Sequence, residues 1–181
     1  MSEQPTTTTF ARKKIALNNN KLALSAPLPG QKNIYSTLSV DIYKNNPRIE
    51  VATKDPNLMN KENDFGKIRA AMDAPVFYAF LELVREAADS QGPMERRIDN
   101  FNHTFEGGQR SQEIQHVSTL VVGRDQEGHI YVSVLSTKPG WAKIKFVFGV
   151  PDYRFHRFVN ADGGKPSRAE TSVIMARAYY T

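Results

Sequence analysis

The strongest constraint on the fold is an alternation of apolar and polar residues over positions 117–148. Alternation with period two is typical of strands that bury one face. Two tetrapeptides rich in Gly, Pro and Asp interrupt it, and each can reverse the chain. The pattern predicts an antiparallel meander with strands at Val117–Arg124, His129–Ser136 and Trp141–Phe148, joined by turns at Asp125–Gly128 and Thr137–Gly140.

The same alternation divides the side chains of this meander between two faces. The predicted core face gathers Ile130, Val132, Val134, Ile144, Phe146 and Phe148. The opposite face gathers Tyr131, Ser133, Leu135, Trp141, Lys143, Lys145 and Val147. The second face therefore combines aromatic rings with ammonium groups.

Other segments add strands and two helices. Turn chemistry around Asn45-Asn46-Pro47 predicts a hairpin over 37–53, and a short strand is expected at 67–72. A helix is expected from Pro75, capped by Asp73, to about Ser90. Residues 94–105 form an expected strand or ribbon. A Ser167–Glu170 capping box predicts a C-terminal helix to about Tyr180.

These elements predict an α+β protein. It has an antiparallel sheet of five to seven strands, a central helix and a C-terminal helix, and it need not be an OB barrel. The length of 181 residues suits one domain, expected at 21–181. Residues 1–20 have little to bury and carry Arg12, Lys13 and Lys14, so we expect a disordered basic N-terminal arm there.

The composition restricts the classes of partner and site that this protein can have. The formal net charge of +5 favours an anionic partner. The absence of cysteine excludes disulfides and thiolate sites. No apolar run approaches the roughly 20 residues that span a bilayer, and no secretory signal is expected. The expectation is a cytoplasmic protein without membrane contact.

Signals of catalysis are weak. The four histidines are scattered, and no helical i, i+4 pair suggests a zinc site. Neither a nucleophile elbow nor a dinucleotide-binding glycine motif is present. Gly163–Ser167 has the wrong spacing for a phosphate-binding loop. We expect a non-enzymatic protein without a cofactor or metal.

Aromatic and basic residues instead recur together in three segments. A single-stranded nucleic acid is a polyanion that carries flat rings, so it suits surfaces that offer both cations and stacking platforms. The predicted phosphate ligands are Arg96, Arg97, Lys143, Lys145, Arg154 and Arg157, with Arg12, Lys13 and Lys14 adding non-specific attraction. The predicted stacking residues are Phe101, Tyr131, Trp141 and Tyr153.

The blander interpretation of these segments is an ordinary half-buried sheet with solvated lysines and aromatics that close a sheet end. Recognition of double-stranded DNA is disfavoured, because the 75–90 helix is acidic on balance and lacks a basic face that could enter the major groove.

Three stretches resemble a known family: His116–Tyr131, Lys143–Phe146 and Tyr153–Gly163. They are similar to small single-stranded-DNA-binding proteins of tailed bacteriophages, in particular the type that acts as a cofactor of the phage RNA polymerase. The resemblance implies sequence-tolerant binding, self-association into a dimer or tetramer, and a fold other than the usual OB barrel. It also implies a role at melted promoters or in replication, in the cytoplasm of the infected bacterium.

One departure weakens the implied recruitment of partners. Many single-strand-binding proteins end in an acidic tail, whereas this sequence ends Ala176–Thr181 without acids. A second hypothesis therefore stays open: a structural or interaction protein, in which Tyr131 and Trp141 are buried in contacts between subunits.

Overall fold

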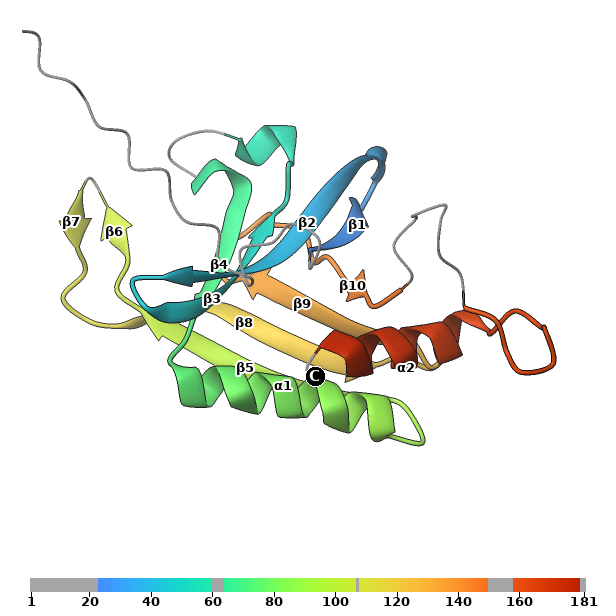
Figure 1. The fold of residues 1–181 in the computed structure, drawn as a ribbon. Coiled ribbons are helices and arrows are strands. Elements are labelled where there is room, and N and C mark those ends of the chain that lie inside the picture. Colours follow the sequence, from blue (N-terminus) through green and yellow to red (C-terminus); the bar gives the residue numbers. More distant parts are fainter. Residues whose placement is uncertain (1–22, 60–63, 107, 150–157, 180–181) are drawn as a thin grey trace, which may run out of the picture.

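Two four-stranded antiparallel sheets form the body of the computed structural model, which describes residues 23–59, 64–106, 108–149 and 158–179 (Figure 1). Sheet A has the order β1-β2-β3-β4, with β1 at Leu24–Leu28, β2 at Gln31–Tyr43, β3 at Asn46–Ala52 and β4 at Lys67–Ala71. Sheet B has the order β10-β9-β8-β5, with β5 at Met94–Asn102, β8 at Gln115–Arg124, β9 at Ile130–Ser136 and β10 at Phe146–Val147. The α+β class with antiparallel sheets is confirmed, but the strands form two sheets where one was expected.

Sheet A is built around the predicted hairpin. Lys44 and Asn45 form its two-residue turn, and both have positive φ angles, 50° and 67°. That combination matches the twist of antiparallel strands and favours Asn. The register pairs Val40 with Ile49, so the apolar residues of both strands share one face. The sequence analysis missed β1 and the first residues of β2.

Sheet B confirms the first two strands of the predicted meander. Val122 pairs with Val132, and Val132 also pairs with Phe146. The third strand is much shorter than expected, because only Phe146–Val147 is a strand. The predicted division of side chains nevertheless holds: Ile144 and Phe148 are buried, while Lys143 and Lys145 are exposed.

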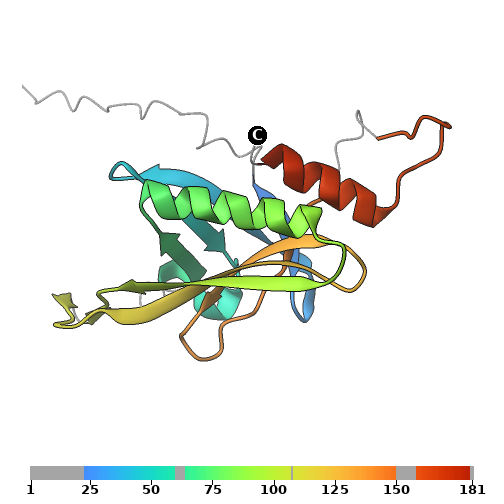
Figure 2. The ribbon, with the colours of Figure 1, turned by 90° about the horizontal axis from the view of Figure 1, so that it is seen from below.

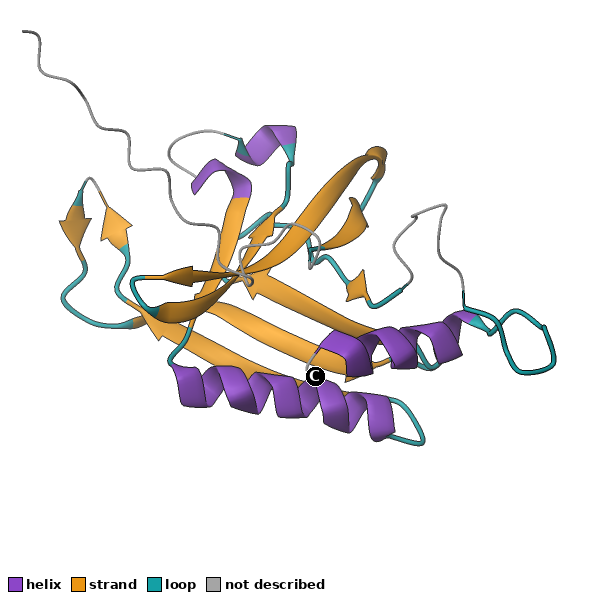
Figure 3. Ribbon diagram, in the orientation of Figure 1, coloured by secondary structure: helices purple, strands orange, loops and turns teal. Residues whose placement is uncertain are grey.

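The core lies between the inner faces of the two sheets and is completed by helices. Helix α1, Ala74–Asp89, contributes Phe80 and Val84, which are 1% and 0% exposed. Helix α2, Arg168–Tyr179, contributes Ala176. Figure 2 shows both helices along one side of the molecule. Figure 3 shows the strands that they cover.

Both helices begin at their predicted caps. The Oδ1 atom of Asp73 accepts a hydrogen bond from the Val76 amide at 3.1 Å. In α2, the Ser167 amide donates to Glu170 Oε2 at 2.7 Å and the Glu170 amide donates to Ser167 Oγ at 3.1 Å. These reciprocal bonds satisfy amides that helix geometry leaves unpaired.

A small two-stranded sheet extends from one end of sheet B. It comprises β6, Phe105–Glu106, and β7, Gln109–Arg110, and lies at and just beyond the end of the strand expected at 94–105. Figure 1 shows it projecting beyond the ends of β5 and β8. Among the described residues, no helix is both long enough and apolar enough to cross a membrane.

Candidate nucleic-acid interface

The outer face of sheet B collects several of the predicted binding residues. Because Val122 and Val132 face the core, their sequence neighbours project outward. Across β5, β8 and β9 the register places Glu95, Gly123 and Tyr131 in one row, and Tyr131 also pairs with Val147 of β10. Glu95, near the start of β5, thus lies in one row with residues of β8, β9 and β10 that are far from it in sequence.

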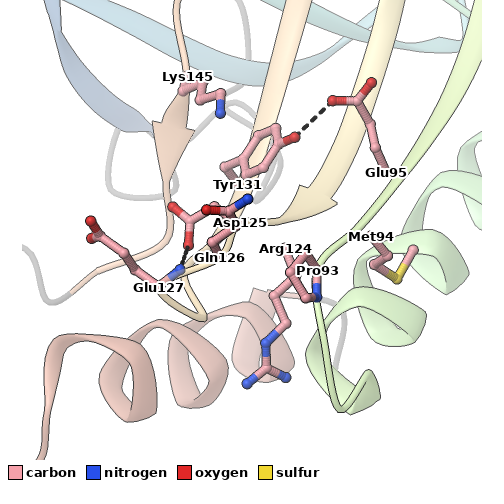
Figure 4. A pocket seen from close by; sticks show the side chains of 9 residues that line it. All are labelled: Pro93, Met94, Glu95, Arg124, Asp125, Gln126, Glu127, Tyr131 and Lys145. Carbon is pink, nitrogen blue, oxygen red and sulfur yellow. Dashed lines mark hydrogen bonds between the residues drawn. The ribbon is translucent and has the colours of Figure 1, made fainter.

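Four side chains on this face form a connected row, which we call the Glu95 array: Arg97, Glu95, Tyr131 and Lys145 (Figure 4 shows the last three). The Arg97 guanidinium donates to Glu95 Oε1 from Nε at 2.9 Å and from the terminal nitrogen at 2.6 Å. The Tyr131 hydroxyl donates to the other carboxylate oxygen at 2.8 Å. The Lys145 ammonium lies 4.5 Å from the Tyr131 ring centroid.

Gly123 makes room for this arrangement. A Cβ atom at this position would lie 2.6 Å from the Tyr131 hydroxyl oxygen and 2.7 Å from the Met94 carbonyl oxygen. Both contacts are closer than real Cβ atoms allow. The absence of a side chain at Gly123 therefore lets the Tyr131 phenol cross β8 and reach Glu95 on β5.

The array changes the acidity of its members. Burial raises the pKa of Tyr131 to about 12, and its hydrogen bond to Glu95 acts in the same direction. The pKa of Glu95 is lowered, first by hydrogen bonds from Arg97 and then by the bond from Tyr131. At neutral pH the array thus contains a neutral phenol, one carboxylate and two cations.

The prediction that Tyr131 offers an open stacking surface is wrong. The residue is only 5% exposed, because its phenol lies over Gly123 and Lys145 covers the ring. Alternation correctly predicts the outward direction of this side chain. It does not predict that neighbouring residues bury the ring.

Trp141 and Lys143 lie in the irregular segment before β10. The Trp141 ring is half-buried against the core, and the Lys138 ammonium lies 5.8 Å from its centroid. Lys143 is exposed, and so is Lys145. This segment and the turn before it therefore present Lys138, Lys143 and Lys145 beside one half-buried aromatic ring, that of Trp141.

Arg96 does not share the outer face with Arg97. Arg96 pairs with Val122 in the register, so it projects toward the helical side, and its guanidinium lies 2.6 Å from Glu86 of α1. The two arginines are adjacent in sequence, and strand alternation sends them to opposite faces. The two predicted phosphate ligands therefore lie on different faces of sheet B, and their binding of phosphate stays a prediction.

Phe101 lies at the far end of β5, where the register shifts between Asn100 and Phe101. Its side chain is 56% exposed, and its ring centroid is 5.2 Å from that of His116. It lies four positions along the strand from Arg97, about 13 Å along the chain. It is therefore remote from the Glu95 array.

The remaining predicted residues fall outside the described part of the chain. They are Arg12, Lys13 and Lys14 of the expected N-terminal arm, and Tyr153, Arg154 and Arg157 of the alternating aromatic-basic run. Their proposed contacts stay predictions.

An open hollow of about 610 Å³ lies at one end of the outer face (Figure 4). Three carboxylates line it, from Glu95, Asp125 and Glu127, together with Lys145. Arg124 also lines it, so three carboxylates face two cations, and Tyr131 of the Glu95 array belongs to the same lining. Within the described ranges, no group of three or more His, Asp or Glu side chains is arranged to hold a metal ion.

The sequence analysis missed Glu95 and Gly123. Neither stands in a motif, and both gain their roles only from the β5–β8–β9 register. In comparisons with known proteins, no family model, no curated protein and no solved structure matches this chain.

Proposed function

We propose that this protein binds single-stranded DNA without sequence preference, using the outer face of sheet B at Lys145 and the adjoining segment that carries Trp141 and Lys143. One observation carries the proposal: lysine ammonium groups lie beside both aromatic rings of this region, over Trp141 and over Tyr131. Phosphates and bases of a single strand require cations and rings in such proximity.

The Glu95 array gives the proposal a mechanism. Arg97 and Tyr131 are held by Glu95, so they are positioned before DNA arrives. Lys145 has a long flexible side chain. Its ammonium can move from the Tyr131 ring to a phosphate when DNA binds, while Tyr131 stays packed over Gly123. The lysines supply counterion release, and Trp141 supplies the first stacking surface.

Fluorescence anisotropy of a labelled oligo-dT, titrated at two salt concentrations with a duplex competitor, tests this proposal. We expect tight, salt-sensitive binding that the duplex fails to compete away. The double variant Lys143→Ala/Lys145→Ala removes two phosphate ligands. It should bind more weakly, and its log–log salt slope should flatten by about 1.4, the value for two contacts on a single strand.

A matched control removes the same charge elsewhere. Lys165 and Arg168 are exposed and lie immediately before and at the start of α2. Lys165→Ala/Arg168→Ala should keep the wild-type slope. If both double variants flatten the slope equally, the effect is one of net charge and the outer face of sheet B is not the site. Absence of wild-type binding at low salt refutes the function.

The biological setting of this activity is proposed from the resemblance to phage proteins. It comprises support of a phage RNA polymerase at melted promoters, or of replication, by a dimer or tetramer. Sedimentation velocity and a transcription assay with the phage polymerase test these two parts separately from DNA binding.

A second candidate function has its own supporting observation. Phe105 belongs to β6 of the projecting hairpin, Phe101 and Ile114 lie on the chain segments that lead into and out of it, and the three are 69%, 56% and 62% exposed. Exposed apolar side chains grouped on a projecting element are typical of protein–protein contacts. On this hypothesis Phe105→Ser changes the oligomeric state while oligo-dT binding is absent or unaffected.

A further inference from the structure

The outer face of sheet A carries two exposed tyrosines that the sequence analysis did not consider. Tyr35 and Tyr43 are 55% and 45% exposed. Both belong to β2, and their even spacing places them on the same face of the strand. They are at most about 26 Å apart along β2, with Thr37, Ser39 and Asp41 between them on that face.

Cations surround the tyrosine at the end of β2. The Arg48 guanidinium lies 4.7 Å from the Tyr43 ring centroid, and the Lys44 ammonium lies 5.4 Å from it. Arg48 also donates to Asp41 from Nε at 2.9 Å. The ring and the guanidinium are thus held together at the β2–β3 turn.

The row continues across β3 and β4. Glu50 accepts a hydrogen bond from Arg69 Nε at 3.0 Å and pairs with Lys67 Nζ at 3.0 Å. Burial alone would raise the pKa of Glu50, but the hydrogen bonds from Lys67 and Arg69 outweigh burial and lower it. With Lys44 and Arg48, this face has four cations and two carboxylates, a net charge of +2.

The chemistry of this face indicates which kind of molecule can bind to it, a protein or a nucleic acid. A protein that buries apolar surface needs contiguous apolar side chains, whereas small polar residues and ion pairs separate these tyrosines. A single-stranded nucleic acid needs isolated rings for its bases and a positive surface for its phosphates. The net charge and the two separated rings fit the second requirement.

We propose that the outer face of sheet A is a second contact surface for single-stranded nucleic acid. Tyr35 and Tyr43 stack on bases several nucleotides apart, and Lys44, Lys67 and Arg69 contact the phosphates between them. Asp41 and Glu50 hold the arginines in place. This inference rests on the proposed function and adds a surface on the other sheet, separate from the Glu95 array.

The test is the affinity of the double variant Tyr35→Ala/Tyr43→Ala for labelled oligo-dT. Loss of two stacking contacts should weaken binding about thirtyfold or more. Tyr78→Ala is the matched control, because Tyr78 is a 67% exposed tyrosine on α1. The control should bind as wild type, and Tyr35→Phe/Tyr43→Phe should retain most of the affinity because it keeps both rings.

Photo-crosslinking of the wild-type protein to bromouracil-substituted DNA gives a readout that does not depend on the folding of a variant. Crosslinked peptides that contain Tyr35 or Tyr43 support the inference. If the wild-type protein binds DNA while the double variant binds equally well, the inference fails and the proposed function stands. If the wild-type protein binds no DNA, both fail. A change in oligomeric state in the double variant, with unchanged DNA affinity, assigns the face to contacts between copies and overturns the inference.

Discussion

The outer faces of the two sheets hold their tyrosines in opposite ways. In sheet B, Tyr131 is 5% exposed and donates its hydroxyl to Glu95 across Gly123. In sheet A, Tyr43 remains 45% exposed beside Arg48. Both sheets also pair an outward glutamate with cations: Glu95 binds Arg97 in sheet B, and Glu50 binds Lys67 and Arg69 in sheet A.

The difference arises from the residue opposite each ring. Gly123 leaves a space on β8 that the Tyr131 ring fills, whereas Tyr43 stands at a hairpin end and pairs with Asn46. A glycine inside a strand lets an aromatic neighbour lie flat across it, while a turn leaves a ring in solvent. The two faces can therefore be compared by changing one residue at a time.

The largest expected effect comes from filling the space in sheet B. Gly123→Ala places a methyl group within 2.7 Å of the Tyr131 ring and the Met94 carbonyl. We expect the free energy of unfolding to fall by about 2–3 kcal/mol, the upper range for overpacking. Urea unfolding measures this. Gly92→Ala is the control, because no atom lies within 4 Å of the added Cβ and φ is not positive there. An equal loss in both variants would contradict the role given to Gly123.

The next largest effect on stability distinguishes the hydroxyl of Tyr131 from that of Tyr43. Tyr131→Phe removes a buried donor to a carboxylate, and hydrogen bonds to charged groups contribute about 1.5–3 kcal/mol. We expect a loss near the lower end, about 1.5 kcal/mol, because the Glu95 carboxylate also binds Arg97. Tyr43→Phe should cost almost nothing, because that tyrosine is 45% exposed. Urea unfolding at pH 7 checks both, and similar values would remove the contrast between the faces.

Alkaline pH has a smaller effect, which is to lower the free energy of unfolding. The pKa of Tyr131 is about 12 in the folded protein and about 10 in the unfolded chain. The neutral phenol therefore stabilises the fold fully below pH 10, and this contribution is lost as the pH rises toward 12. From pH 10 to pH 11 the loss is about 1 kcal/mol for this group. Tyr179, also raised to about 12 by burial, adds a similar loss. Denaturant unfolding at both pH values should show a shallower fall in Tyr131→Phe, and an unchanged fall would contradict the assignment.

The sequence predicts local features of this molecule better than it predicts how strands assemble. The caps at Asp73 and at Ser167–Glu170, and the buried set around Val132 and Phe146, follow from rules that act within a few residues. Division into two sheets depends on pairing between distant segments, for which alternation carries no signal.

The candidate site shows the same limit. The outward direction of Lys143 and Lys145 is predictable from period two. The Glu95 array is not, because Glu95, Gly123 and Tyr131 meet only through the β5–β8–β9 register. The opposite directions of Arg96 and Arg97 were predictable from the same alternation, provided that residues 94–102 were treated strictly as a strand.

The smallest effects compare one arginine on each face. Arg48 forms a salt bridge with Asp41, and the two side chains are 17% and 28% exposed. Arg97 binds Glu95 with exposures of 67% and 39%. Solvent screens the second pair more strongly, so Arg97→Met should leave the free energy of unfolding almost unchanged, whereas Arg48→Met should lower it by about 1 kcal/mol. Unfolding in low and high salt measures both differences. Salt should reduce the Arg97 effect to nearly zero and leave most of the Arg48 effect, because partly buried pairs are screened less. The reverse order would mean that the Glu95 array, and not the Asp41–Arg48 pair, is the more strongly coupled of the two surfaces.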